Sequence, residues 1–294
     1  CTSEDILSPV ASYAVPELGT NFVRKMLADT KPSTFAELVK ISGLSHGTDV
    51  WLNNAEALVL GKTQFGKIDF KEVIGCRDDI MVYLMYQGLE PAMAFKIMEF
   101  VRKGKPSKDK ATWEDLKKYM RERNVPEWYI WSCEQIKYMF PKAHATAYVL
   151  SAMRIAWFKL NKPILFYSAY FTIRANQFDP VVMTSGANAI RNKINDIQKD
   201  PDSKNKDLDL LSDLEVALEM TKRGLKFKMV DIEKSEAKQF VIDGDSLIMP
   251  FASIDKLGEN AANLIVEERN KRPFSSKKDA KVRGKINNTV FDTM

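Results

Sequence analysis

The sequence has few cysteines and histidines, and it has no long apolar run. Its 294 residues include three cysteines and two histidines, His46 and His144. The cysteines lie far apart, are odd in number and match no zinc-ligand spacing, which favours a reduced, cytoplasmic chain. No run of about 18 apolar residues is present, so we expect no membrane span and no membrane partner. The first residues also lack the basic and apolar regions of a signal peptide.

Catalytic motifs are also scarce. The phosphate-loop pattern Gly-x4-Gly-Lys-Ser/Thr is absent, and no Ser-His-Asp or Cys-His arrangement is recognisable. Asp243-Gly244-Asp245 resembles a pair of metal-binding carboxylates, but an Asp-Gly dipeptide between the strand-like runs QFVI and SLIM is more typical of a hairpin turn. We therefore expect neither a metal site nor a catalytic centre in this chain. Because the sequence begins without Met and ends inside a helical pattern, we also expect a piece of a longer protein.

Helical patterning and a mild basic excess are what the sequence does contain. Charged residues make up 28% of it and the formal net charge is +5, which permits a polyanionic partner without establishing one. Helical periodicity covers most of residues 21–175 and returns in two helices before Gly224. Residues 227–251 carry the only clear strand signal, and residues 251–294 again indicate short helices. We predict a mainly α fold with a β-hairpin.

Residues at the ends of the helical patterns predict where individual helices begin and stop. One helix is predicted over RDDIMVYLMYQG, with Asp78 or Asp79 near its N-cap and Gly88 after its end, and a second is predicted between Pro91 and Gly104. A further helical pattern spans residues 45–59, after the turn-like SGLSHG.

One predicted helix begins with two potential cations, which is unusual. Lys142 and His144 stand at its start, within YMFPKAHATAYVLSAMRIAWFK. The first amides of a helix are unpaired and its N-terminus is partly positive, so a cation there costs about a few tenths of a kcal/mol unless an anion is present. One interpretation is a phosphate site on which the amides, Lys142 and His144 converge. The alternative is that Lys142 lies along the surface and His144 packs.

Other polar groups also admit two interpretations each. Arg102, Lys103 and Lys105 surround a predicted helix C-terminus, where cations are common without any ligand. Arg77 stands just before a helix and either pairs with a neighbouring aspartate or binds a phosphate. Residues 41–49, ISGLSHGTD, form a predicted small-residue loop whose glycines would let a ligand approach the backbone. A corner between two helices is the alternative for this stretch.

The segment PFASIDKLGENAANLIVEER has the shape of half a helix–hairpin–helix motif. Leu257 and Gly258 fit its tight turn, whereas Lys256 stands where a first glycine often occurs. In such a motif Gly258 opens helix amides toward a DNA phosphate without reading bases. Residues 283–293 suggest a second such unit, and the basic run over 271–285 supports contact with phosphates. The alternative is an ordinary helical hairpin.

Four stretches, taken together and in this order, resemble one known family. They resemble the fingers and duplex-binding regions of PolC-type alpha subunits of bacterial DNA polymerase III, the C-family replicative polymerases. The resemblance covers nearly the whole chain, and the block FPKAHATAY is its most specific part. The stretches are KPSTFAELVKISGLSHGTDVWLNNAE, EVIGCRDDIMVYLMYQGLEPAMAFKIMEFVRKGK, VPEWYIWSCEQIKYMFPKAHATAYVLSAMRIAWFKLNKPILFYSAYFTIRA and FVIDGDSLIMPF.

The resemblance implies a mechanism and partners. In this family, palm carboxylates bind two Mg²⁺ ions, and the primer 3′-hydroxyl attacks the α-phosphate of a dNTP while pyrophosphate leaves. The fingers hold the triphosphate and close over the nascent base pair. The palm and a proofreading exonuclease are expected upstream, so the chain alone is expected to be inactive. Primer–template DNA, dNTP, the sliding clamp and other replisome proteins are the implied partners, although the family's clamp-binding tail does not occur before Met294.

The resemblance also divides the chain into parts. Residues 1–28 are expected to connect to the palm, and residues 29–178 to form the fingers domain. Residues 179–228 are expected to form a helical connector. Residues 229–294 are expected to form a duplex-binding domain with helix–hairpin–helix-like units.

The family's functions can then be assigned to residues of this sequence. Cations expected to bind the triphosphate are Arg77, Arg102, Lys103, Lys105, Lys142 and His144, with Arg102 and Lys142 foremost. Residues expected to border the base-pair pocket are Ser42, Gly43, Ser45, His46 and Phe140. Residues expected to contact the duplex are Lys256, Gly258, Asn260, Lys271, Arg272, Arg283 and Lys285. Phe140 is equally compatible with a position in the core.

A second hypothesis is that the chain is not part of a polymerase. The chain would then be a stand-alone, non-enzymatic nucleic-acid-binding module built on helix–hairpin–helix units. An Asp-x-Asp strand motif just upstream would favour the polymerase over this alternative.

Overall fold

A computed structural model describes residues 2–202 and 204–291, and the chain divides into two compact units. The helical unit is Val15–Arg154, and the mixed unit combines Cys1–Ala14 with Ile155–Met294. The fold is mainly α with a small β element, as predicted. The functional boundaries expected after residues 28, 178 and 228 stay predictions. Within the described residues, no helix is both long and apolar enough to cross a membrane.

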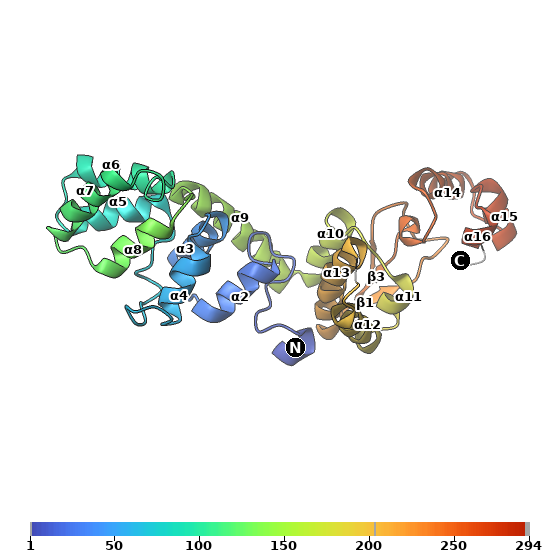
Figure 1. Cartoon of the computed structure of the whole chain (residues 1–294). Helices are drawn as coiled ribbons and strands as arrows, with labels where there is room; N and C mark the ends of the chain where they lie inside the picture. The colour runs from blue at the N-terminus through green and yellow to red at the C-terminus, as the bar shows by residue number, and fades with distance from the viewer. Residues whose placement is uncertain (1, 203, 292–294) are drawn as a thin grey trace. The chain divides into compact units, whose positions relative to one another are not determined.

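The helical unit consists of helices joined mostly by short connections, with a longer one over residues 60–76 between α4 and α5 (Figure 1). Its elements are α2 (Asn21–Thr30), α3 (Phe35–His46), the irregular turn η1 (Trp51–Ala55), α4 (Glu56–Val59), α5 (Arg77–Tyr86), α6 (Pro91–Arg102), α7 (Lys110–Arg121), α8 (Glu127–Gln135) and the first part of α9 (Lys142–Asn161). The chain passes from one unit to the other within α9.

The helix ends predicted for α5 and α6 are confirmed. Pro91 is the first residue of α6, and Gly104 follows its end in the left-handed conformation, with φ of 61°. Cys76 is the N-cap of α5, and Asp79 lies at its third position. The Oδ2 atom of Asp79 accepts hydrogen bonds from the Gly75 and Cys76 amides, at 3.1 and 3.0 Å. A carboxylate thus satisfies amides that the helix itself leaves unpaired.

The helical pattern over residues 45–59 is interrupted in the structure. Leu52 and Asn53 have non-helical backbone angles, with ψ of 137° and φ of 58° respectively. The buried amide of Asn54 explains the interruption, because it donates to the carbonyl of Ser132 on α8 and accepts from the Ser132 hydroxyl, at 3.1 and 2.7 Å. Asn54 and Ser132 satisfy each other's buried polar groups although they lie on different elements. This long-range contact therefore overrides the local preference for helix.

The mixed unit combines helices with a small sheet (Figure 1). Its elements are α1 (Ser3–Ile6), the last part of α9, α10 (Pro163–Ile173), α11 (Pro180–Thr184), α12 (Ala187–Lys199), α13 (Asn205–Lys222), β1 (Lys226–Lys228), β2 (Val241–Asp243), β3 (Ser246–Ile248), η2 (Phe251–Ser253), α14 (Glu259–Lys271), α15 (Lys277–Arg283) and α16 (Asn288–Phe291).

The sheet has the strand order β1-β3-β2. Strands β2 and β3 are antiparallel around Gly244, whose φ is 66°, so the predicted Asp-Gly hairpin turn is confirmed. Each aspartate of this turn lies near a lysine, with Asp243 Oδ2 2.7 Å from Lys228 and Asp245 Oδ2 3.6 Å from Lys226. The parallel pairing of β1 with β3 was not predicted.

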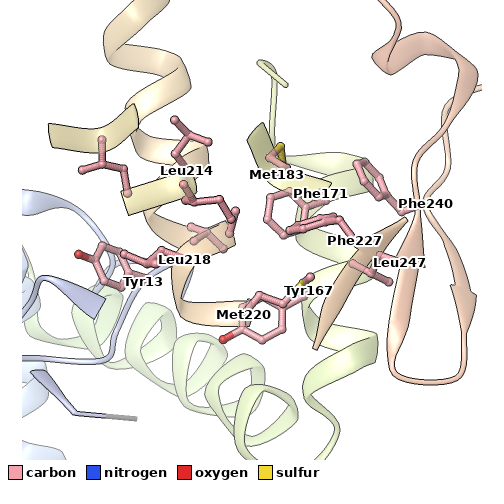
Figure 2. Packing of buried hydrophobic residues seen from close by; sticks show 14 of the residues in the cluster. Tyr13, Tyr167, Phe171, Met183, Leu214, Leu218, Met220, Phe227, Phe240 and Leu247 are labelled. Carbon is pink, nitrogen blue, oxygen red and sulfur yellow. The ribbon is translucent and has the colours of Figure 1, made fainter. Parts of the chain in front are cut away.

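Aromatic side chains fill the core between the sheet and the helices of the mixed unit. Figure 2 shows Phe171 of α10 beside Phe227 of β1, and their ring centroids lie 5.1 Å apart. Phe240 packs on both rings, at 5.7 and 6.3 Å. Ile6 and Tyr13 belong to the same buried cluster. The first residues of the chain are therefore part of this core.

A buried ion pair lies within the same unit. Lys159 Nζ is 2.7 Å from Glu219 Oε2, and the two side chains are 4% and 1% exposed. The ammonium also donates to the carbonyls of Ala11 and Tyr13, at 2.9 and 2.6 Å. Glu219 accepts a second hydrogen bond from the hydroxyl of Tyr167, at 3.0 Å. Both charges are thus compensated by short contacts, as burial requires.

Candidate functional site

The N-termini of α5 and α9 meet in the helical unit. The Lys142 amide donates to Asp78 Oδ2 at 2.8 Å, so an aspartate that precedes α9 by more than sixty residues pairs its first amide. The Lys142 ammonium lies 2.9 Å from Asp79 Oδ1, and this hydrogen bond raises the pKa of Lys142. The cation at the start of α9 is therefore offset by the chain's own carboxylates.

Arg77 lies at the same meeting point. Its amide donates to the Phe140 carbonyl at 3.2 Å, and its Nε lies 3.8 Å from Asp78 Oδ2. Arg77 and Lys142 thus share one pair of aspartates, and their side chains are 36% and 52% exposed. Two partly exposed cations therefore lie at these two helix N-termini.

Two imidazoles and two aromatic rings form a cluster beside these N-termini. His46 stacks on Phe140 with centroids 4.8 Å apart, and Phe140 meets His144 edge-on at 5.0 Å. Tyr148 lies 4.7 Å from His144 and 6.3 Å from His46. The Nε2 atom of His46 also lies 3.0 Å from Glu17 Oε2. We call His46, Phe140, His144 and Tyr148 the imidazole–aromatic cluster.

The loop predicted over residues 41–49 is mostly helix, and this is a correction. Residues 41–46 form the last turns of α3, so Ser42, Gly43, Ser45 and His46 are helical. Ser42 and Gly43 are buried, and a Cβ on Gly43 would lie about 2.5 Å from the Gly75 carbonyl oxygen. Gly43 therefore permits close packing of α3 against the start of α5. Ser45 and His46 remain accessible at the end of the helix.

The cations at the end of α6 form a separate group. Arg102 and Lys103 both pair with Glu99, through Nη2 at 2.8 Å and Nζ at 2.8 Å. These hydrogen bonds, that of Arg102 above all, lower the pKa of Glu99 to about 2. The Lys105 ammonium lies 5.9 Å from the centroid of the Phe100 ring. Among the described residues, no contact joins this group to the aspartates at α5 and α9.

Residues 137–142 run past both groups. The Lys137 backbone lies against Gly104, where a Cβ would be 2.5 Å from the Lys137 oxygen. The Thr48 amide donates to the Tyr138 carbonyl at 2.9 Å, and Lys142 follows at the start of α9. The structure therefore brings Arg77, Lys142 and the imidazole–aromatic cluster together. It places the group of Arg102, Lys103 and Lys105 near the other end of this segment, where Gly104 lies against Lys137.

Sequence reasoning missed two members of this region. Tyr148 lies four residues after His144 on α9, a helical spacing that signals a shared face. Glu17 gave no such signal, because it lies in a segment interpreted as a connection and reaches His46 only through the fold. Ala145 packs with Val39 and Cys76, which explains a small residue in the first turn of α9.

Two hairpins carry the predicted duplex contacts of the mixed unit. Lys256 and Lys285 both adopt left-handed backbones, with φ of 63° and 51°. Lys256 thus occupies a conformation for which glycine is normal, so the turn keeps the motif's backbone although its residue departs from the motif. Gly258 caps α14 with an extended φ of −68°, and a Cβ there would meet no atom within 4 Å. Asn260 is exposed in the first turn of α14.

The other predicted duplex contacts are bound within the mixed unit. Lys271 pairs with Glu268 at 2.7 Å, and Arg272 lies 3.4 Å from Asp279. Arg283 reaches both of these carboxylates, at 3.4 and 3.2 Å, and also donates to the Arg272 carbonyl at 2.9 Å. The Arg283 side chain is only 15% exposed. These contacts favour a role for Arg283 in joining α14 to α15.

Comparisons with known proteins bear on both regions. A family model described as the bacterial DNA polymerase III alpha subunit finger domain matches residues 3–124, and one described as a helix-hairpin-helix motif matches residues 224–294. The DNA polymerase III PolC-type of Halalkalibacterium halodurans is 55% identical over 100% of this chain. Those of Bacillus subtilis (strain 168) and Staphylococcus aureus (strain MW2) are 55% and 52% identical over 99% of it. The chain spans 20% of the length of each of these relatives.

Proposed function

This chain belongs to the PolC-type DNA polymerase III family, and from that premise we propose that it holds an incoming dNTP and grips primer–template DNA for a replicative polymerase. The helical unit takes the first task and the hairpins of the mixed unit take the second. The observation that carries the proposal is that Arg77 and Lys142 lie together at two helix N-termini, beside the imidazole–aromatic cluster. The relatives match the helical unit as well as the hairpins, which favours a polymerase segment over a stand-alone module.

The triphosphate is proposed to bind at the α5 and α9 N-termini. An ammonium has three donors, and one of those of Lys142 is directed to Asp79. The others, with the guanidinium of Arg77, can receive phosphate oxygens. Phe140 and His46 present flat rings next to these cations and would border the base pair. Arg102 and Lys103 would meet the outer phosphates, after release from Glu99.

The chemistry of the complete enzyme lies outside this chain. Nucleotidyl transfer with two Mg²⁺ ions and palm carboxylates is our proposal for the full protein. In the part of the chain that the structure describes, no group of three or more metal-ligating side chains lies together. We propose that the metal is bound by other segments of the full protein, and we expect no polymerisation by this chain alone. A cytoplasmic location and a sliding-clamp partner also stay predictions.

Replacing Lys142 with alanine is expected to weaken dNTP binding about 10- to 100-fold, because a charge-assisted hydrogen bond to phosphate contributes about 1.5–3 kcal/mol. Isothermal titration of the 294-residue chain with dNTP measures the affinity. Lys118→Ala is the matched control, because Lys118 is an exposed lysine on α7. Arg102→Ala is expected to have a smaller effect, since Glu99 already occupies its guanidinium. Equal affinities for Lys142→Ala, Lys118→Ala and the parent would refute the proposed site.

Replacing Gly258 with alanine is expected to weaken duplex binding about 5- to 10-fold without changing stability. The backbone angle suits alanine and its Cβ would meet no protein atom, but the methyl group would obstruct a phosphate approaching the α14 amides. Fluorescence anisotropy with a primer–template duplex, repeated over a range of salt concentrations, measures both affinity and salt dependence. In the same assay Lys285→Ala should reduce the slope of log K against log salt by about one. Unchanged DNA affinity in both variants would exclude the hairpins as the contact.

A further inference from the structure

The helical unit contains a cavity that adjoins the proposed triphosphate site at Lys142. Its volume is about 760 Å³, and it lies between the start of α3, residues 71–74, α5 and the start of α8. Cavities of roughly 300–1,000 Å³ are the size that holds small organic ligands. Apart from Lys142 and Asp79 at its edge, its lining has no role in the function proposed above.

Aromatic side chains form one wall of this cavity. Tyr83 and Tyr86 come from α5, and Trp128 and Tyr129 come from α8. The Tyr83 and Tyr129 rings stack with centroids 4.0 Å apart, and Trp128 meets Tyr129 edge-on at 5.3 Å. Tyr86 is 87% exposed, although it is a large aromatic residue. A wall of this kind suits a planar ring, because offset and edge-on ring contacts are both favourable.

A buried hydroxyl without a partner lines the same cavity. Tyr129 is 1% exposed, and its hydroxyl has no hydrogen-bond partner in the described structure. A buried polar group left unpaired is unfavourable by about 1–3 kcal/mol. A ligand that brings an acceptor to Tyr129 would remove this cost.

Lysines on another part of the lining favour an anion. The Lys40 ammonium donates to the carbonyls of Lys71 and Val73, at 2.5 and 2.8 Å, and it forms no ion pair among the described residues. Burial lowers the pKa of Lys40. Glu37, the carboxylate on the same helix, is bonded to the Ser33 and Thr34 amides at 2.7 and 2.9 Å. The side chain of Lys71 adds a second cation to the lining.

We propose that this cavity binds a nucleotide, with its base on the wall of Tyr83, Tyr86 and Trp128, an acceptor of the base at the Tyr129 hydroxyl, and its phosphate toward Lys40 and Lys71. The cavity shares Lys142 and Asp79 with the dNTP site proposed above, but the contacts proposed here are made by other residues. The same chemistry is offered by a free nucleotide and by one nucleotide of a single-stranded DNA. Stacking on aromatic rings and contact with a lysine are how proteins hold either one.

The test titrates the 294-residue chain with dAMP and, separately, with a short oligodeoxyadenylate. Tyr129→Phe is expected to weaken binding about 3- to 10-fold and to leave the melting temperature without ligand unchanged or higher, since it removes an unpaired hydroxyl. Trp128→Ala is expected to weaken binding about five-fold or more. Tyr119→Phe, on α7 and outside the cavity lining, is the control and should bind like the parent.

The outcome of this titration distinguishes a free nucleotide from a single strand and shows whether the cavity binds either one. Binding of dAMP that depends on Tyr129 and Trp128 supports a free nucleotide, and binding of the oligonucleotide alone with the same dependence supports a single strand. The proposal is overturned if neither probe binds, or if binding is the same in Tyr129→Phe, Trp128→Ala and the parent. Binding lost in Lys142→Ala but intact in both cavity variants would assign the nucleotide to the α9 N-terminus and would also overturn it.

Discussion

Replacing Lys159 with methionine is expected to destabilise the mixed unit by about 3–5 kcal/mol. Methionine fills the volume of the lysine stem but leaves Glu219 as a buried charge without its partner. The carbonyls of Ala11 and Tyr13 lose their donor in the same change. The first residues of the chain should therefore loosen from the core together with α13.

Native-state hydrogen exchange of α10 and α13 amides measures this loss, and the amides of α6 and α7 in the helical unit serve as an internal reference. The double variant Lys159→Met/Glu219→Gln should recover part of the stability, because the glutamine side chain is neutral and can still accept from the Tyr167 hydroxyl. A single variant as stable as the parent, or a double variant that is no better than Lys159→Met, would show that the pair is not coupled as described.

Replacing Gly104 with alanine is expected to destabilise the helical unit by about 2–4 kcal/mol. Part of the cost is the left-handed backbone, which is unfavourable for alanine by about 1–2 kcal/mol. The rest comes from overpacking, since the new Cβ would lie 2.5 Å from the Lys137 oxygen and 2.9 Å from its Cα. The backbone of Lys137 must then move, and Phe140 and Lys142 follow it in the chain.

Gly88 provides the matched control. It follows the end of α5 as Gly104 follows α6, with φ of 82°, but a Cβ there would meet nothing within 4 Å. Gly88→Ala should therefore cost only the backbone part, about 1–2 kcal/mol. Urea denaturation measures both variants, and only Gly104→Ala should also weaken dNTP binding. Equal losses of stability in the two variants would mean that the contact with Lys137 contributes nothing.

Features that depend on a few neighbouring residues could be predicted from the sequence. Pro91 and Gly104 marked the ends of α6, and Asp243-Gly244 marked the hairpin, because each requires a particular backbone conformation or removes a donor. Helical periodicity over most of the chain extended this to the mainly α fold. Residues with strong local requirements thus specify local structure.

Features that depend on distant contacts could not be predicted in this way. The helical pattern over residues 45–59 is interrupted by hydrogen bonds between Asn54 and Ser132, which lie 78 residues apart. Lys142 looked like a cation at a bare helix start, because nothing in its own segment shows that Asp78 and Asp79 lie beside it. Residue types therefore suggested a candidate site, and only the fold shows how its charges are paired.

That electrostatic state would make anion binding at the proposed α9 site an exchange of one anion for another. Asp78 already accepts from the first amide of α9, and Asp79 already pairs with the ammonium of Lys142. An incoming anion therefore competes with two carboxylates of the chain itself. A singly charged anion offers little that a carboxylate does not already provide, whereas a polyphosphate can also engage Arg77. Selectivity for highly charged ligands follows from this internal competition, without any element that recognises the number of phosphates.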